Sequence, residues 1–415
     1  MKFGGTSVAD AQRIKRAARR IVVQREAGKR VVAVLSARGQ TTDELIAMAE
    51  EVSPHPDRRE MDMLLSTGER ISCALCAMAI NDLGHRAISL TGSQAGIVTD
   101  TSHTKARILD VRGDRIREAL DEDRIVLVAG FQGVSTSRDV TTLGRGGSDT
   151  TAVAVAAAIG AEVCEIYTDV AGVFSADPRL VPEARKLPIV SFEEMLEMAA
   201  SGAKVLQLRS VEYARNHGVR IHCRSSFEDG PGTVVLSEDE TMERPLVTAV
   251  THSTEEARIS LLGVPDRPGA AAAIFGALAR ANCNVDTIIQ NEPLGQGRDA
   301  EVSFTIAAED LRAAAQALSP VATELGIARI DTDPEIGKVS IVGAGMRSHP
   351  GVAAKVFEVL AEEQINIQMI STSPIKIACV IASEAVPAAV NALHSAFDLA
   401  ASEVEREQPI GQQAR

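Results

Sequence analysis

The feature of this sequence that most restricts its fold is an internal repeat in the last third of the chain. Residues 259–263 read Ile-Ser-Leu-Leu-Gly, and residues 339–343 read Val-Ser-Ile-Val-Gly, 80 residues later. A Pro-Gly pair at 268–269 recurs at 350–351, a spacing of 82 residues. Each copy has the pattern of a strand, a Pro-Gly turn, a helix and a strand, followed by a further strand, helix and strand. Two copies of this length predict two small α+β domains rather than a solenoid.

The residues before the repeat have a different pattern, in which short Val/Ile runs alternate with helical periodicity. We expect strands at 30–35, 87–90, 125–129 and 163–167, and helices at 13–27, 43–51, 60–83 and 150–159. Continuous apolar strands separated by helices are typical of a mostly parallel sheet that helices cover on both faces. The fold class is therefore α/β over residues 1–236, followed by a linker at 237–254 and small domains at 255–333 and 334–410.

Charge and composition exclude several classes of partner. The chain has 43 Lys and Arg against 56 Asp and Glu, a net charge of −13, and only nine Phe, two Tyr and no Trp. Nucleic-acid-binding domains are basic and single-strand binders need aromatic platforms, so we expect no nucleic-acid partner. The most apolar stretch, 152–161, has about half of the ~20 residues that a membrane span needs. We therefore expect small-molecule partners and no membrane.

The cysteines and histidines do not predict a protein-held metal. Six cysteines are scattered, and the one close pair, Cys73 and Cys76, lies in an apolar helical pattern without further ligands. Such a pair is expected to pack in the core. Reduced thiols and the lack of a signal-peptide pattern predict a cytoplasmic protein.

Three polar segments are candidates for binding an anion. Residues 2–7 read Lys-Phe-Gly-Gly-Thr-Ser, and residues 142–150 have three glycines interleaved with Arg, Ser and Asp just before an apolar helix. Glycine-rich loops that lead into a helix expose backbone N–H groups to phosphates. Residues 167–179 follow a strand, where α/β folds bind ligands, although Asp177-Pro178 also fits a surface turn. No P-loop motif occurs.

Together these segments resemble the aspartate kinases of the amino-acid kinase family. Residues 2–8 are similar to the N-terminal signature, 36–45 to the second loop, 65–70 to the substrate segment, and 142–149 and 167–179 to the active-site and adenine segments. The repeat is similar to tandem ACT domains, which bind amino-acid effectors. The resemblance implies the amino-acid kinase fold followed by two ferredoxin-like ACT domains. The family normally has several apolar residues before this lysine, so either the first central strand is shortened here or the start is assigned late.

The resemblance also implies a reaction: ATP, with Mg²⁺, would phosphorylate the side-chain carboxylate of L-aspartate, giving 4-phospho-L-aspartate. This is the first step toward lysine, threonine, methionine and diaminopimelate. Lys2 and Asp149 would be catalytic. Aspartate would be held by Ser36, Thr42, Glu69, Arg145 and Ser148, and ATP by Lys2, Gly4, Gly5, Thr168, Asp169, Phe174, Arg179 and Lys204.

Feedback control by lysine or threonine follows from the resemblance to ACT domains. The effector residues would be Asp266, Gly269, Ala270, Ala271, Asn284, Asp286, Gln290, Asn366, Ile367, Thr372 and Ser373. Family effector sites lie between chains, so a homo-oligomer is implied. An α2β2 assembly with an ACT-only chain starting at Met242 is a further hypothesis. Two alternatives remain: an inactive amino-acid sensor, and a kinase acting on glutamate or acetylglutamate.

Overall fold

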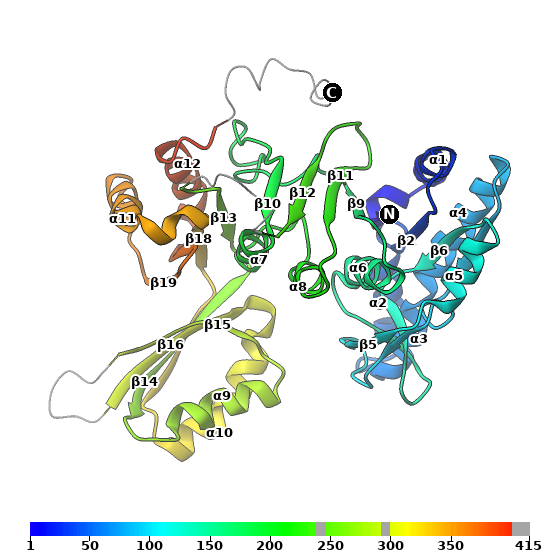
Figure 1. Ribbon diagram of the computed structural model, residues 1–415. Helices are drawn as coiled ribbons and strands as arrows, with labels where there is room; N and C mark the ends of the chain where they lie inside the picture. Colours follow the sequence, from blue (N-terminus) through cyan, green and yellow to red (C-terminus); the bar gives the residue numbers. More distant parts are fainter. Residues whose placement is uncertain (238–245, 292–298, 350, 401–415) are drawn as a thin grey trace.

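The structure is a computed structural model that describes residues 1–237, 246–291, 299–349 and 351–400. A large N-terminal domain and two smaller repeat domains are arranged side by side (Figure 1). The second repeat domain packs against the N-terminal domain, and the first repeat domain projects below it in this view. Met242 and the end of the predicted last domain, 401–410, lie outside the described residues.

The N-terminal domain is built on an eight-stranded sheet. Neighbouring strands are parallel except β11 and β12, which are antiparallel. The strands lie in the order β10 (Ile189–Ser191), β12 (Thr233–Leu236), β11 (Ile221–Ser225), β9 (Cys164–Thr168), β1 (Lys2–Phe3), β2 (Val32–Leu35), β6 (Ile125–Ala129) and β3 (Ala87–Leu90). The predicted α/β class is confirmed, and the two-residue β1 lies inside the sheet between β9 and β2.

Helices cover both faces of this sheet, which explains why its strands are continuously apolar. Val32 and Val34 of β2 face one hydrophobic core, whereas Ala33 and Leu35 face the other. The second core packs under α1 (Ala11–Glu26) and α4 (Thr67–Asp82). The first packs under α5 (Asp114–Asp121), α6 (Gly147–Ile159), α7 (Phe192–Ala200) and α8 (Leu208–His217).

Two shorter helices and a small sheet stand beside the main sheet. The helices are α2 (Thr41–Val52) and α3 (Arg58–Leu65), and the sheet has the order β5 (Ile108–Val111), β4 (Ile97–Thr99), β7 (Gln132–Ser135) and β8 (Val140–Thr142). The predicted helical region 60–83 is divided between α3 and α4 at Ser66. By length and composition alone this stretch, Arg58–Asp82, could cross a membrane. Its Cys73, Cys76 and Ile80 are buried against α1, as in a core helix.

The first repeat domain has the order of elements that the repeat predicts. It contains β14 (Glu256–Pro265), α9 (Ala270–Arg280), β15 (Val285–Asn291), β16 (Asp299–Ala307), α10 (Leu311–Leu325) and β17 (Arg329–Asp333). The sheet is antiparallel, in the order β15-β16-β14-β17. Gly269, at φ 98°, precedes α9, and Gly351, at φ 108°, precedes α11 of the second copy. The Pro-Gly pairs therefore mark the starts of both helices.

The second repeat domain completes its sheet in a way that the sequence did not predict. It contains β18 (Ile336–Val342), α11 (Val352–Glu362), β19 (Met369–Ser373), β20 (Lys376–Ala382) and α12 (Val386–Ala396). Among the residues that the structure describes, which end at 400, the fourth strand does not follow the last helix. It is β13 (Ala249–Ser253), from the predicted linker, which pairs antiparallel along β18 over five residues. Because β13 already occupies this edge of β18, no edge remains there for a later strand.

Candidate active site

Lys2 stands where the central strands end. Strands β1, β2 and β9 are parallel, so Gly4 and Ser36, which follow β1 and β2, and Thr168, the last residue of β9, lie along one edge of the sheet. Nζ of Lys2 is 2.5 Å from Oδ1 of Asp149, and both side chains are largely buried. The amide of Gly4 donates to the Tyr167 carbonyl at 3.3 Å, and Gly5 begins the short helix that follows β1. The ion pair thus joins the first predicted segment to the glycine-rich loop.

The glycine-rich loop leads directly into α6. Gly146 has φ 71°, and a Cβ there would lie 2.1 Å from Cγ of Gln207, so the position requires glycine. This tight turn buries Ser148 and Asp149 in the first turn of α6. An acidic side chain near a helix N-terminus is stabilised by the free N–H groups. Arg145, in contrast, is exposed, and none of the described residues pairs with it.

Glu69 is a buried carboxylate with an unused oxygen. It lies in the first turn of α4 with 3% exposure, and its Oε1 accepts from the backbone N–H of Ala37 at 3.1 Å. Within the described part of the chain, its Oε2 has no hydrogen-bond partner. Burial raises the pKa of Glu69 to about 7, against smaller opposing effects of hydrogen bonds and Arg70. Such a carboxylate can receive a cationic group of a ligand.

The remaining predicted substrate residues border the same region from the loop after β2. Ser36 directly follows β2, and Thr42 is in the first turn of α2; both are partly exposed. The N–H of Ser36 donates to the carbonyl of Phe3 at 3.1 Å. Since Ala37 between them bonds to Glu69, the second loop and the substrate segment are in direct contact.

A cavity of about 530 Å³ holds most of the predicted nucleotide residues. Its lining includes Thr168, Asp169, Phe174, Arg179 and Lys204. Asp177 forms a two-point ion pair with Arg179, which holds the pKa of that carboxyl below its usual value. Lys2, Gly4 and Gly5 are not in the lining and stand at the end of β1 instead.

Part of this cavity comes from residues that sequence reasoning missed. His252 to Glu255, at and after the end of β13, form one wall, and Met198 of α7 contributes to another. Glu255 pairs with Lys204, and the amide of Val250 donates to the carbonyl of Ser175 at 2.7 Å. The composition of 237–254 indicated only a linker, because strand pairing with β18, 80 or more residues away, leaves no local signal.

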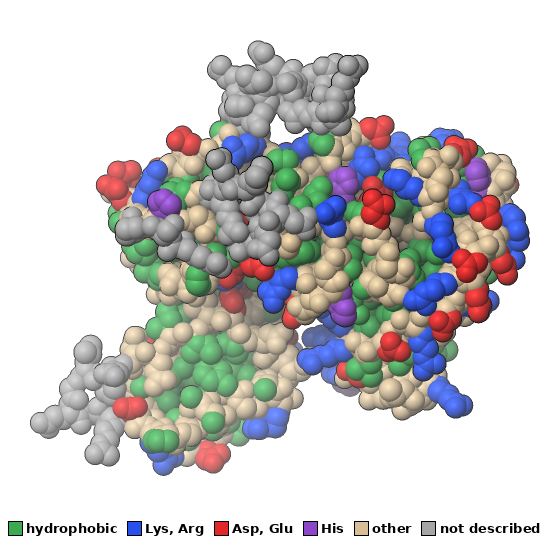
Figure 2. Space-filling model, viewed as in Figure 1, with side chains coloured by type: hydrophobic (Ala, Val, Ile, Leu, Met, Phe, Trp, Pro, Cys, Tyr) green, Lys and Arg blue, Asp and Glu red, His purple; other side chains and the backbone are tan. Residues whose placement is uncertain are grey.

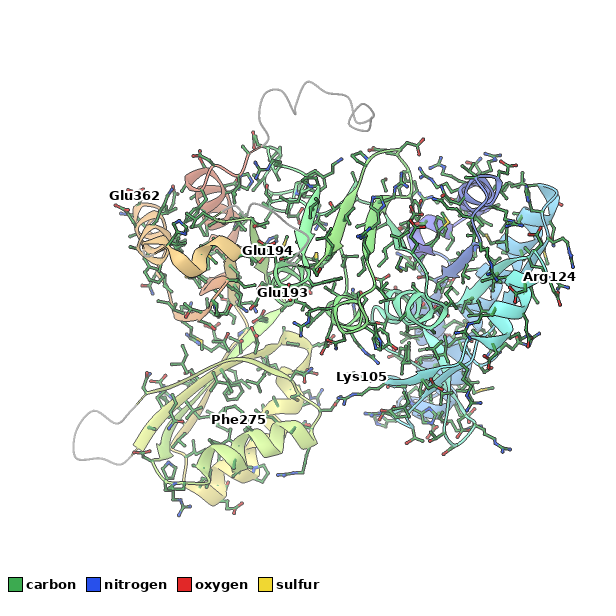
Figure 3. All side chains as sticks on the ribbon, viewed as in Figure 1. Lys105, Arg124, Glu193, Glu194, Phe275 and Glu362 are labelled. Carbon is green, nitrogen blue, oxygen red and sulfur yellow. The ribbon has the colours of Figure 1, made fainter. Side chains whose placement is uncertain are left out.

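Helix α7 connects the cavity to the second repeat domain. Oε1 of Glu194 accepts from Thr248 Oγ1 at 2.7 Å and from the backbone N–H of Ala344 at 3.1 Å. Figure 3 labels Glu194 at this junction. Glu197 accepts from Ser373 Oγ at 2.9 Å and pairs with Lys376 Nζ at 2.9 Å. The hairpin of β19 and β20 is therefore fixed to a helix that also lines the cavity.

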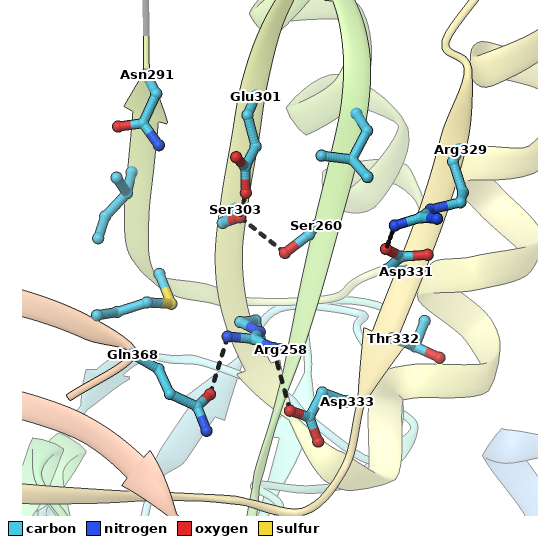
Figure 4. Close-up of a pocket in the computed structure, with 13 residues that line it drawn as sticks. Arg258, Ser260, Asn291, Glu301, Ser303, Arg329, Asp331, Thr332, Asp333 and Gln368 are labelled. Carbon is cyan, nitrogen blue, oxygen red and sulfur yellow. Dashed lines mark hydrogen bonds and ion pairs between the residues drawn. The ribbon is translucent and has the colours of Figure 1, made fainter. Parts of the chain in front are cut away.

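The predicted effector residues do not converge on one cavity within this chain. Asp286 pairs with the buried Lys338 of β18 at 2.6 Å, and Ser373 bonds to Glu197. The others are exposed or half-buried except Ala270. A separate polar cavity of about 370 Å³ lies on the sheet of the first repeat domain, and Gln368 and Met369 close one side (Figure 4). None of the predicted effector residues lines it.

Comparison with known proteins supplies the family. A model of the amino acid kinase family matches residues 1–225, and ACT-domain models match 258–322 and 339–397. The aspartokinase of Mycolicibacterium smegmatis is 57% identical over 401 residues, covering 96% of this chain and 95% of that protein. The chain belongs to the aspartokinases.

Solved aspartokinase structures agree with this assignment. Escherichia coli aspartokinase III in complex with aspartate and ADP, in the R-state, has a TM-score of 0.80 and 26% identity, covering 95% of this chain and 98% of that one. The same enzyme with lysine and aspartate, in the T-state, has a TM-score of 0.73 at the same identity and coverage. The predicted family, the fold and the tandem ACT domains are confirmed, and a glutamate or acetylglutamate kinase is disfavoured.

Proposed function

We propose that this chain transfers the γ-phosphoryl group of ATP to the side-chain carboxylate of L-aspartate, giving ADP and 4-phospho-L-aspartate. The observation that carries the proposal is the buried Lys2–Asp149 ion pair, 2.5 Å long, at the carboxyl edge of the sheet. It stands between the unpartnered oxygen of Glu69 and the nucleotide cavity. The reaction begins the synthesis of lysine, threonine, methionine and diaminopimelate.

The chemistry needs positive charge more than a base. The side-chain carboxylate of aspartate has an ordinary pKa of about 3.9, so it is already an anionic nucleophile at neutral pH. The barrier is the approach of this anion to a polyanionic phosphate, which positioning and fixed positive charge reduce. Lys2 and the positive end of the α6 helix dipole supply that charge. Asp149 keeps Lys2 in place and removes no proton.

The substrate residues divide by the groups that they bind. The unpartnered Oε2 of Glu69 receives the α-ammonium group of aspartate. The exposed guanidinium of Arg145 binds the α-carboxylate in a two-point contact. Ser36, Thr42 and Ser148 donate hydrogen bonds around them. Glu69 and Arg145 thus bind the two oppositely charged groups that every α-amino acid carries. The side chain of the bound amino acid is then directed toward Lys2.

Magnesium fits the site as a partner of the nucleotide rather than of the protein. Among the described residues, no three His, Cys, Asp or Glu side chains cluster as a metal site. Mg²⁺ retains several waters and needs only one or two carboxylates besides phosphates. Asp149 is the carboxylate that could contribute. When bound, Mg²⁺ would supply further positive charge at the β- and γ-phosphates.

We also propose feedback control by lysine, threonine or both. The T-state structure of the E. coli relative contains lysine, which supports this class of effector. Because the predicted effector residues are mostly exposed in the single chain, we infer that the sites form between chains, in a homo-oligomer or with an ACT-only chain. Six buried free cysteines support a reducing, cytoplasmic location.

The deciding experiment measures ATP-dependent aspartyl-hydroxamate formation, with and without lysine plus threonine. Activity that falls with the effectors supports both the kinase and its control. Activity that ignores them supports the kinase and refutes control by these amino acids. No activity under any condition refutes the kinase and favours the alternative of an inactive sensor, which effector binding by calorimetry would then test.

A further inference from the structure

A fully buried carboxylate behind the glycine-rich loop has no role in the mechanism above. Asp62 lies in α3 with 0% exposure. It accepts hydrogen bonds from Nδ1 of His103 at 2.6 Å, from the backbone N–H of Thr104 at 3.1 Å, and from Oγ1 of Thr142 at 2.5 Å. A carboxylate is costly to remove from water, so it persists in a core only where such donors replace the water.

These bonds join three segments that are far apart in the sequence. His103 and Thr104 lie in the loop between β4 and β5, and Thr142 is the last residue of β8. The glycine-rich loop begins directly after Thr142. Through Asp62, α3 therefore holds both the loop at 102–105 and the start of the glycine-rich loop.

The loop at 102–105 in turn restricts the position of the glycine-rich loop. Thr104 has φ 68°, a left-handed conformation that a β-branched residue rarely adopts, and the bond from its N–H to Asp62 holds it there. Its carbonyl faces Gly144, where a Cβ would lie only 3.2 Å away. Gly144 also has a left-handed φ of 77°, and it directly precedes Arg145.

The opposite side of the same loop is held by a cation. Arg209 of α8 donates to the carbonyl of Leu143 at 2.9 Å and to the carbonyl of Ala106 at 2.8 Å. The N–H of Ala106 donates to the carbonyl of Thr142 at 2.9 Å. The backbone just before Arg145 is thus fixed on one side by Asp62 and on the other by Arg209, while the Arg145 side chain is free to meet a ligand.

We propose that Asp62 is a positioning residue for the glycine-rich loop, to which aspartate binding is assigned above. It sets the conformation of Thr104 and the place of Thr142, and through them the direction in which Arg145 approaches the α-carboxylate of the substrate. Asp62 itself touches neither substrate nor nucleotide. The inference rests on the proposed function, because it assigns the loop to aspartate.

The test compares Asp62→Asn with the wild-type chain in steady-state kinetics. Asparagine has the same shape as aspartate but carries no charge. Its NH₂ group would also face groups that now donate hydrogen bonds to the carboxylate, so at least one of these bonds would be lost. We expect the KM for aspartate to rise about tenfold, while the KM for ATP changes less than twofold, because the nucleotide cavity lies on the other side of Lys2. Asp57→Asn is the matched control, since Asp57 is an exposed carboxylate that caps the same helix; its KM values should equal those of the wild type.

Two further variants keep the test decisive if Asp62→Asn fails to fold. Thr142→Val removes one donor to Asp62 and should raise the KM for aspartate about threefold, whereas Thr142→Ser keeps the hydroxyl and should restore it. A lower melting temperature with both KM values unchanged would overturn the inference and leave Asp62 purely structural. Absence of aspartate phosphorylation by the wild-type chain would instead refute the proposed function, so the two failures are distinguishable.

Discussion

The residues proposed to bind aspartate (the aspartate half of the site) and those proposed to bind the nucleotide (the nucleotide half) have different surroundings. Of the residues proposed to bind aspartate, Glu69 and Ser148 are buried, Ser36 and Thr42 are partly exposed, and Arg145 is exposed. All of them belong to the kinase domain. The nucleotide half is an open cavity, one wall of which is β13, a strand of the second ACT sheet. Its cations Arg179 and Lys204 are mostly exposed. If these assignments hold, the proposed aspartate site is formed within one domain, whereas the proposed nucleotide site depends on the position of the second ACT domain.

Charged side chains of both signs are mixed on the exterior. Figure 2 shows Lys and Arg side chains interspersed with Asp and Glu over the visible face. In Figure 3, Lys105 extends from the kinase domain toward the first ACT domain. The comparison therefore rests on burial and on which domain supplies each wall, and the following experiments change one half at a time.

The largest effect should come from the ion pair at the boundary of the two halves. Lys2→Ala removes the buried positive charge and should lower kcat about 1,000-fold or more, the size of losing a principal transition-state contact. Rapid-quench kinetics with saturating substrates measures it. Lys15→Ala, an exposed lysine on α1, is the control. A Lys2→Ala enzyme with near-normal kcat would mean that the pair is structural.

Within the aspartate half, Glu69 should control affinity for the amino acid. Glu69→Gln removes the charge that faces the α-ammonium group and should raise the KM for aspartate about 100-fold, with little change in the KM for ATP. Glu60→Gln, exposed on α3, is the control. Equal increases in both KM values would show that the two halves are not independent.

The raised pKa of Glu69 also predicts how stability depends on pH. The folded-state value of about 7 exceeds the unfolded value of 4.5, so the folded protein binds the extra proton between these limits. Without substrate, ionisation of Glu69 should therefore cost about 3 kcal/mol of stability as the pH rises from 4.5 to 7. Thermal melts of the wild type and Glu69→Gln should diverge over this window, with the glutamine variant more stable at pH 8. Parallel pH profiles would contradict the burial of this charge.

In the nucleotide half, single charges should matter less. Lys204→Ala should raise the KM for ATP about fivefold and leave the KM for aspartate unchanged, because an exposed ion pair contributes only about 1 kcal/mol. Initial-rate measurements at varied ATP test this, with the exposed Arg215→Ala on α8 as the control. A larger effect on aspartate than on ATP would reverse the assignment of the two halves.

The smallest effect should appear only in regulation. Glu197→Gln weakens the contacts from α7 to Ser373 and Lys376, and should shift the effector concentration for half-inhibition about threefold, with basal kcat unchanged. Lys376→Met removes the same ion pair from the other side and should give the same shift. If both variants respond to effectors like the wild type, the nucleotide half is regulated through a different contact.

The sequence predicted the parts of this molecule that depend on local pattern. The strands at 87–90 and 125–129 are confirmed at both ends, because each is a short, mainly apolar segment that directly follows an arginine. The Pro-Gly starts of α9 and α11 are likewise local. Of the predicted site residues, Lys2 and Asp149 do meet, and five of the nucleotide residues share one cavity. Their catalytic and binding roles stay predictions.

The parts that escaped prediction depend on partners distant in the sequence. Asp62 gives no signal in the sequence, because it is one of several charged residues on α3 and its importance comes from the convergence of 103, 104 and 142 on it. Glu194 and Glu197 read as ordinary helix residues until α7 is placed against the second ACT domain. Strand β13 was not predicted for the same reason: it pairs with β18, which is distant from it in the sequence and belongs to the repeat.

The two-residue strand β1 has a consequence for the order in which the molecule can assemble. Its neighbours are β2, close behind it in the chain, and β9, which follows only after α6 and the glycine-rich loop. Contacts between distant segments carry a loop-closure cost and form slowly. During synthesis Lys2 must therefore remain without one of its two strand neighbours until the chain through β9 has emerged. Completion of the active site is a late event in folding, and recovery of activity on refolding should lag behind recovery of helical circular dichroism.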